Sequence, residues 1–417
     1  MIDSRIARER VLEFLKGNPI PALAGMEEAV VSHWIQNPDD SVYAGFRDIF
    51  AGAVVSARKR RSDHFVAEAE RLECKFRMNV PFPPPPKPRF TFIDLFAGIG
   101  GFRIAMQNQS GQCVFSSEWD KAAQKTYEAN FGEVPFGDIT RQEIKDMIPD
   151  GFDVLCAGFP CQPFSLAGVS ARKSLKKEHG FACKTQGTLF FDVMQIAKVK
   201  RPKVLFLENV RNLVNHDKGR TFAVIEESVR ELGYSFHSAV IDASPFVPQK
   251  RIRCYIVCVR ENGGFEFPKI SGSPKPLSSV LESDVDSRYT ISDKLWQGHQ
   301  KRTQRNLSRG TGFTTFCADV AQPAHTLVSR YYKDGKECLI PQTLGNPRML
   351  TPRECARLQG YDDKFLLPQS RCTAYRQMGN SVAVPVVEKI AAAIYSQILK
   401  GESHEIRDST ERKVCCS

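Results

Sequence analysis

Apolar positions recur with two different periods along the chain, and the period changes near residue 90. Before it, helical spacing over residues 6–15, 26–35 and 54–72 predicts three helices. Residues 81–88 hold six prolines and favour extended polyproline geometry, which is typical of a semi-rigid spacer. We therefore expect a helical N-terminal extension over residues 1–80 and a Pro-rich linker over 81–89. The basic cluster Lys59-Arg60-Arg61 leaves two interpretations for the extension, an accessory region or a direct contact with DNA.

From residue 90 onward, short apolar runs alternate with helical patterns. The runs that predict strands are residues 90–96, 114–117, 152–157, 203–207, 238–242 and 254–259, with a further short segment before Asp138. Strands separated by helices predict an α/β domain with a mostly parallel sheet and helices on both faces. We assign this domain to residues 90–260.

Residues 261–346 interrupt this alternation, because they are rich in Ser, Gly, Lys and Arg. They predict a smaller, irregular domain with β-like pieces at residues 325–329 and 337–340. The regular pattern returns over residues 347–400. There Thr351 is a suitable N-cap for a helix that begins at Pro352, and a last helix is expected over residues 384–399. Residues 401–417 form a polar tail.

Composition and net charge indicate which kinds of partner, such as nucleic acid, metal or membrane, the protein could bind. The formal net charge of +11 over 417 residues is compatible with a nucleic acid partner, although a basic soluble protein without one has the same charge. The 13 cysteines show no spacing typical of zinc, so we expect no metal. No apolar run approaches the length of a membrane span. Reduced thiols in a cytoplasm fit these features.

A glycine-rich turn, Gly98-Ile99-Gly100-Gly101, follows the first strand of the sheet and predicts close approach of a ligand to the backbone. Glu118, at the end of the next strand, can accept hydrogen bonds from ribose hydroxyls. Position 103 is Arg where a dinucleotide fingerprint needs Gly, so a nucleoside without phosphates, such as S-adenosylmethionine, fits better. Trp119 could pack on its adenine and Asp138 could accept from its amino group. The alternative is a turn that only joins a strand to a helix.

Two further predicted strands end in side chains that could take part in a reaction. Gly158-Phe159-Pro160-Cys161-Gln162 places a thiol on a stiff loop at the rim of the sheet. Glu208 ends the next predicted strand with a carboxyl group. Taken alone, Cys161 would more often be a small buried side chain, and Glu208 a carboxylate at a helix start.

Five motifs occur in order along the chain: residues 92–101 (FIDLFAGIGG), 158–165 (GFPCQPFS), 208–210 (ENV), 249–253 (QKRIR) and 377–382 (QMGNSV). In these motifs and their order the chain resembles the DNA (cytosine-5) methyltransferase family, and most closely its Dcm-type members. The match covers residues 90–260 and 348–398. It implies a Rossmann-like, S-adenosylmethionine-dependent methyltransferase fold.

The resemblance also implies roles. Cys161 would attack C6 of a flipped-out cytosine, so that C5 can accept the methyl group of S-adenosylmethionine. Glu208 would bond N3 and the exocyclic amine, and Arg253, with Arg251 nearby, would hold O2. Residues 165–186 would form the loop that closes over the base. The implied cofactor-binding residues are Phe96, Gly98, Gly100, Glu118, Trp119, Asp138, Pro160, Leu189, Asn380, Ser381 and Val382.

Target choice in the family resides in the region that corresponds here to residues 261–346. Residues 326–337 and 180–183 are similar to Dcm-type enzymes, which methylate CCWGG. Residues 302–309 carry arginines that could contact guanines or phosphates. The implied partners are double-stranded DNA, bound by a monomer, and a cognate restriction endonuclease. A tRNA cytosine-5 methyltransferase and a non-catalytic DNA-binding regulator remain as alternatives.

Overall fold

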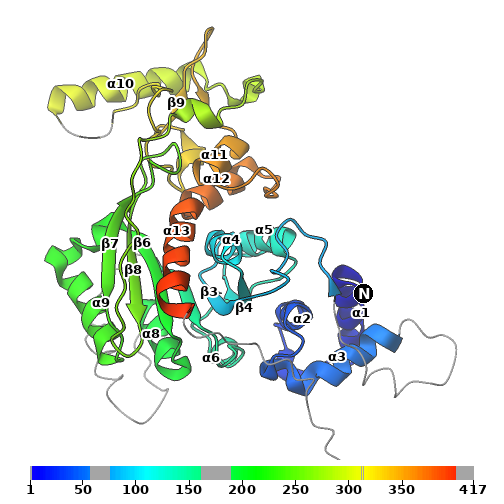
Figure 1. The fold of residues 1–417 in the computed structure, drawn as a ribbon. Helices are drawn as coiled ribbons and strands as arrows, with labels where there is room; N and C mark the ends of the chain where they lie inside the picture. The colour runs from blue at the N-terminus through cyan, green and yellow to red at the C-terminus, as the bar shows by residue number, and fades with distance from the viewer. Residues whose placement is uncertain (1, 57–75, 161–188, 311, 313, 401–417) are drawn as a thin grey trace, which may run out of the picture.

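The computed structural model describes residues 2–56, 76–160, 189–310, 312 and 314–400 (Figure 1). The strands are β1 (Ile2–Asp3), β2 (Phe76–Arg77), β3 (Phe90–Leu95), β4 (Gly111–Ser117), β5 (Val154–Gly158), β6 (Val204–Val210), β7 (His237–Asp242), β8 (Ile252–Val259), β9 (Leu339–Ile340) and β10 (Arg348–Met349). The main helices are α1 (Ser4–Gly17), α2 (Glu27–Gln36), α3 (Ala44–Ser56), α4 (Gly101–Asn108), α5 (Lys121–Phe131), α6 (Gln142–Lys145), α8 (Leu189–Lys200), α9 (Arg220–Glu231), α10 (Asp293–Arg309), α11 (Pro352–Leu358), α12 (Arg371–Asn380) and α13 (Val384–Ile394).

A six-stranded sheet in the order β4-β3-β5-β6-β8-β7 organises the fold. The strands β4, β3, β5 and β6 are parallel, and β8 runs antiparallel to both β6 and β7. The prediction of a mostly parallel α/β sheet is therefore confirmed. The carboxyl ends of the four parallel strands meet at one edge, which is where such sheets bind ligands.

Successive residues of the central strands feed two separate cores. In β5, Val154 and Cys156 belong to the core on one face, whereas Leu155 and Ala157 belong to the core on the other. Helices α4 and α13 contribute to the first core, and α8 and α9 to the second. Because both faces of the sheet are covered, residues 154–157 of β5 and 204–207 of β6 are continuously apolar, as is typical of central parallel strands in an α/β protein.

The N-terminal helices share the second core with the sheet. Helices α1 and α2 confirm the first two predicted helices. The third was expected over residues 54–72, but α3 begins ten residues earlier, at Ala44, and residues 57–75 lie outside the described part of the chain. The Pro-rich segment packs against the α/β domain and does not act as a free spacer. Phe82 is buried against Phe131, and its backbone N–H donates to the carbonyl oxygen of Asn130.

The small region after β8 lies at one end of the sheet, with α10 projecting to one side (Figure 1). The strand expected at residues 325–329 is wrong, because only Ala324 forms a bridge there and residues 325–328 follow without regular structure. The piece at 337–340 is present as β9, which pairs with β10. The predicted cap at Thr351 is confirmed, and its hydroxyl and the Glu354 carboxyl form a reciprocal capping box.

Helices α12 and α13 return the chain to the domain that contains the six-stranded sheet. The stretch Arg371–Leu399 is long and apolar enough by composition to cross a membrane, yet 56% of its most apolar window is buried inside the protein. Residues of α13 such as Val387 and Ile390 belong to the core that covers the sheet beside α4. We therefore interpret this stretch as a core element.

Candidate active site

Glu208 lies on β6 beside the end of β5. The register pairs Gly158 with Glu208, and a Cβ placed on Gly158 would lie 3.7 Å from Oε2 of Glu208. Burial raises the pKa of the Glu208 carboxyl above its ordinary value, although Arg253 and Arg251 favour the ionised form. The position and the raised pKa together suit a carboxyl that holds a proton for a bound base.

Arg253 reaches this carboxyl from the neighbouring strand. Its Nε lies 3.2 Å from Oε1 of Glu208, and its Nη1 donates to the carbonyl oxygen of Ile252 at 2.9 Å. Both charged side chains are mostly buried, at 13% and 12% exposed. Part of the guanidinium therefore remains available at the strand ends.

Arg251 has a different environment from Arg253, although the two were expected to act together. It is 2% exposed, and its guanidinium donates to the carbonyl oxygens of Leu327 at 3.0 Å, of Gly379 at 3.1 Å and of Ser381. Burial lowers its pKa to about 9, and Arg253 contributes to the same effect. This side chain ties three segments together instead of facing the strand ends.

The candidate nucleophile Cys161 and the candidate loop 165–186 lie outside the described residues. The chain can be followed to Pro160, which is exposed. Asn209, to which the sequence analysis gave no role, donates from Nδ2 to the carbonyl oxygen of Phe159 at 2.8 Å. Asn209 thus fixes the segment that leads into Cys161 next to the end of β6.

The structure brings the glycine turn and Glu118 together. The backbone N–H of Gly98 donates to Oε2 of Glu118 at 2.8 Å, and the N–H of Asp120 donates to Oε1 at 2.8 Å. Burial raises the pKa of Glu118, and these two donors act against that rise. Each carboxylate oxygen keeps a lone pair for a ligand hydroxyl.

The turn leaves room for a ligand above Gly98. Phe96, Gly98 and Gly100 all have positive φ angles, of 56°, 56° and 85°. A Cβ on Gly98 would have only the carbonyl oxygen of Phe96 within 4 Å, at 3.9 Å. The open face of the turn, with the acceptor Glu118 beside it, fits a nucleoside ligand such as S-adenosylmethionine.

Ser381 and Val382 are distant in sequence from the glycine turn but pack against it. A Cβ on Gly101 would lie 2.7 Å from Val382 Cγ2 and 3.3 Å from the hydroxyl of Ser381. That hydroxyl bonds the Tyr361 hydroxyl at 2.6 Å. Tyr361 was not singled out in the sequence analysis; only its position beside Ser381 in space reveals it.

Four further residues were predicted to bind the cofactor, and the structure does not bring their side chains together. Trp119 is 77% exposed directly after Glu118, so its ring is free to cover a ligand. Asp138 is half-buried and accepts the backbone N–H of Thr140 at 3.0 Å. Leu189 opens α8 and is half-buried, whereas Asn380 is exposed at the end of α12. No contact in the described structure joins these four side chains to one another.

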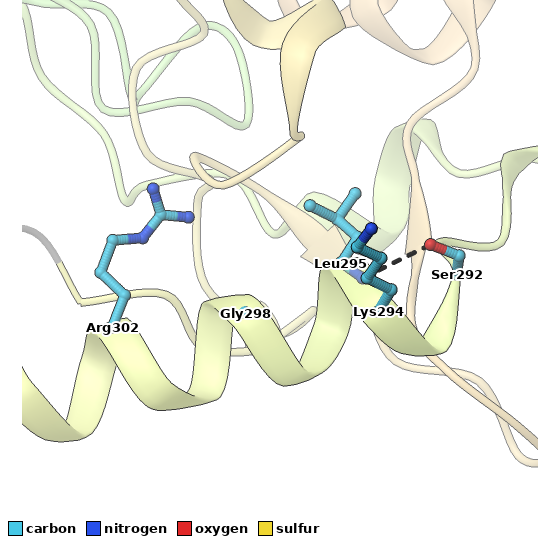
Figure 2. Close-up of a pocket in the computed structure, with 5 residues that line it drawn as sticks. All are labelled: Ser292, Lys294, Leu295, Gly298 and Arg302. Atoms are coloured by element: carbon cyan, nitrogen blue, oxygen red, sulfur yellow. Dashed lines mark hydrogen bonds between the residues drawn. The ribbon is translucent and has the colours of Figure 1, made fainter.

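The candidate guanine-reading segment, residues 302–309, belongs to α10. Arg302 points over a hollow lined by Ser292, Lys294, Leu295 and Gly298 (Figure 2). It lies 2.6 Å from Nδ1 of His299. Arg302 is therefore partly engaged within the small region. Among the described residues, no group of three His, Cys, Asp or Glu side chains could hold a metal ion.

A doubly covered, mostly parallel sheet with a glycine turn and a carboxylate at adjacent strand ends defines an S-adenosylmethionine-dependent methyltransferase fold. Two solved structures share it: a mutant of Spodoptera frugiperda DNMT2, with a TM-score of 0.57 and 18% identity over 73% of this chain and 99% of that one, and Schizosaccharomyces pombe Dnmt2, with a TM-score of 0.57 and 19% identity over 74% and 99%. At these identities the likeness concerns the fold alone.

Sequence comparison gives the family. The model of the C-5 cytosine-specific DNA methylases matches residues 90–396, and the chain belongs to this family. It is 48% identical over 326 residues to the Type II methyltransferase M.SsoII of Shigella sonnei, covering 76% of this chain and 83% of that protein. It is 40% identical over 382 residues to a DNA-cytosine methyltransferase of Escherichia coli K12, covering 76% and 80%. The chain is thus a DNA cytosine-5 methyltransferase, and the family implies S-adenosylmethionine as the methyl donor.

Proposed function

We propose that this enzyme methylates C5 of a flipped-out cytosine in duplex DNA, with Cys161 as the nucleophile. The observation that carries the proposal is the buried pair of Glu208 and Arg253 beside Gly158, three positions before Cys161. C5 of cytosine is a poor nucleophile, and addition of a thiolate at C6 turns the ring into an enamine whose C5 can accept a methyl group. S-adenosylmethionine supplies that methyl group when bound. Loss of the C5 proton then expels the Cys161 thiolate from C6 and restores the aromatic ring.

Glu208 assists the addition of Cys161 by bonding the Watson–Crick edge of the base. A carboxyl whose pKa is raised by burial can donate a proton to N3, while its other oxygen accepts from the exocyclic amine. Arg253 holds this carboxyl in place and can offer its remaining donors to O2 of the base. Because the base edge is inaccessible within a stacked duplex, these contacts require the cytosine to leave the helix.

Other residues prepare the site without touching the base. Arg251 positions the turn at residues 379–381, because its guanidinium bonds two of that turn's carbonyl oxygens. The same turn places Ser381 and Val382 against Gly101. The residues suited to hold S-adenosylmethionine are Gly98 at the turn, Glu118 for the ribose and Trp119 for the adenine.

We infer that residues 261–346 choose the target, which is CCWGG-like by resemblance to Dcm-type enzymes. The similarity to Type II methyltransferases supports a role in protecting DNA from a cognate restriction endonuclease. The enzyme would then work as a monomer on DNA in the cytoplasm, since one chain carries both the catalytic and the recognition parts.

Transfer of labelled methyl from S-adenosylmethionine to unmethylated duplex DNA tests this proposal, with tRNA and Cys161→Ser as controls. Bisulfite sequencing then locates the methylated cytosines. We expect label at C5 of cytosine in one short sequence, and none with Cys161→Ser although that variant still binds DNA. Label in tRNA alone would assign the chain to RNA methylation, and DNA binding without any label would indicate a regulator.

A further inference from the structure

The N-terminal extension and the cofactor half of the site meet at a buried arginine. Arg103 is the third residue of α4, the helix that begins directly after the glycine turn, and it is 0% exposed. Its guanidinium donates to Tyr127 at 3.0 Å and to Glu133 at 2.6 Å, both within the catalytic domain. Its Nη2 donates to Oε1 of Gln36, at the end of α2 in the extension, at 2.6 Å.

Gln36 also bonds the backbone of Phe131, the residue whose ring packs against the glycine turn. Its Nε2 donates to the carbonyl oxygen of Phe131 at 2.9 Å. The guanidinium of Arg103 lies 4.8 Å from the centre of the Phe131 ring, and a Cβ on Gly100 would lie 2.2 Å from the same ring. One side chain of the extension therefore contacts both residues that support the turn.

A second set of contacts reaches the strand that leads to Glu118. Ser116, near the end of β4, donates its backbone N–H to Nε2 of His33 in α2 at 3.1 Å. Its hydroxyl donates to Oε1 of Glu133 at 2.7 Å, and Glu133 is also the partner of Arg103. Because Nε2 accepts, His33 is neutral with its proton on Nδ1, and burial lowers its pKa in keeping with this.

Loss of these hydrogen bonds would shift the side chains and elements that they join. The groups are buried, so a donor or acceptor that loses its partner has no water to replace it. The side chain of Arg103 would then move toward another acceptor, and α4 and the Phe131 ring would move with it. Gly98 and Glu118, which are joined by a hydrogen bond, lie in the turn before α4 and directly after β4, the two elements that carry Arg103 and Ser116.

We propose that Gln36 is a positioning residue for S-adenosylmethionine, through which the N-terminal extension sets the geometry of the cofactor pocket. This inference rests on the function proposed above. It assigns the extension to cofactor binding, as distinct from the DNA contact that its basic cluster suggested. The extension also covers the free edge of β4, where Asn37 donates to the carbonyl oxygen of Cys113 at 3.4 Å.

The test compares two glutamine substitutions in the full-length enzyme. Gln36→Met keeps the volume and removes both hydrogen bonds. Gln112→Met is the matched control, because Gln112 joins β4 to Oδ1 of Asn37 at 2.6 Å and to the backbone carbonyl oxygen of Gln36 at 3.4 Å, but bonds neither Arg103 nor the side chain of Gln36. In equilibrium dialysis with labelled S-adenosylmethionine, we expect Gln36→Met to raise the Kd about tenfold, the effect of losing one hydrogen bond to a charged group. We expect no change in its duplex affinity or in kcat at saturating cofactor, and a parent-like cofactor Kd for Gln112→Met.

Gln36→Glu keeps an oxygen to which Arg103 can donate but loses the donor to the Phe131 carbonyl oxygen, so its cofactor Kd should lie between those of the parent and of Gln36→Met. Gln36→Ala replaces Gln36→Met if the latter does not fold. A parent-like Kd for Gln36→Met, or an equal loss for Gln112→Met, would overturn the inference while methyl transfer by the parent protein leaves the proposed function intact. A parent protein that neither binds S-adenosylmethionine nor methylates DNA would overturn both.

Discussion

The Nε of Arg253 lies 3.2 Å from Oε1 of Glu208, across the antiparallel pairing of β8 with β6. The register pairs Glu208 with Tyr255 and Val210 with Arg253, so the two charged side chains are diagonal neighbours on one face of the sheet. The arginine fixes the position of the carboxyl, while burial favours its protonated form. This arrangement can present both a donor and an acceptor to a cytosine edge.

Replacing Glu208 with Gln should lower the rate of methyl transfer by at least about 100-fold, the usual range for loss of a general acid. The amide can still bond the base, but it cannot give up a proton to N3. Single-turnover methylation at saturating DNA and cofactor measures the effect, with the exposed Glu9→Gln as a control. Parent-like turnover of the Glu208→Gln variant would remove the carboxyl from the mechanism.

The two arginines of the 249–253 motif should separate in their effects. Arg251→Met leaves three buried carbonyl oxygens without a donor and should cost about 3 kcal/mol of folding free energy. Arg253→Met should cost less stability but abolish most turnover, because it loosens Glu208. Urea unfolding and turnover, measured on both variants, check this. The reverse pattern, with Arg253 stabilising and Arg251 needed only for turnover, would contradict the assignment.

Asp94 should make stability depend on pH. It is 1% exposed on β3, and burial raises its pKa to about 8 from an ordinary value of 3.8. Between these two values the folded state keeps a proton that the unfolded state has lost, so stability falls as pH rises from about 4 to about 8. Because Asn does not titrate, the stability of Asp94→Asn should not fall in this way. The Tm of the variant minus that of the parent should therefore increase from pH 5 to pH 8. Parallel Tm curves for the two proteins would show that Asp94 does not titrate in this range.

The exposed face of α10 should contribute charge and little sequence preference to DNA binding. Lys294, Lys301 and Arg305 lie at helical spacing on that face, and their side chains have no partner among the described residues. Arg302 instead lies 3.6 Å from Asp334. Changing the three exposed residues to Gln should weaken duplex binding and reduce the slope of log K against log salt by roughly 2 to 3.

The matched control changes the same number of exposed basic residues away from the small region: Lys16, Lys87 and Lys389. It should leave the salt slope unchanged. Fluorescence anisotropy over a range of salt concentrations measures both variants, and bisulfite sequencing checks the target. A changed target sequence in the α10 variant would mean that this face reads bases, and an unchanged slope would mean that it does not touch DNA.

The sheet could be predicted from sequence because its information is local. Strands buried on both faces are mostly apolar. A glycine turn after one parallel strand lies close to Glu118 at the carboxyl end of the neighbouring strand. The cap at Thr351 is equally local, since it depends on residues 351–354 alone. The strand expected at residues 325–329 failed because β-like composition does not provide a neighbouring strand.

The contacts that could not be predicted join residues far apart in the chain. Arg251 and Arg253 alternate along one strand, and sequence does not show that the first is enclosed by carbonyls from residues 327 to 381. The bond between Gln36 and Arg103 spans 67 residues and two predicted domains. Sequence analysis used Arg103 only as evidence against a dinucleotide fingerprint, and both its burial and its partner Gln36 appear only in three dimensions.

The most direct test of the account uses duplex DNA with 5-fluorocytosine in the methylated target. Fluorine cannot leave C5 as a proton does, so an enzyme that attacks C6 and transfers methyl to C5 stays covalently joined to the base. We predict a cofactor-dependent adduct, mapped by mass spectrometry to the peptide that contains Cys161, and its absence with Cys161→Ser. An active enzyme that forms no adduct, or one joined through another residue, would contradict the central claim.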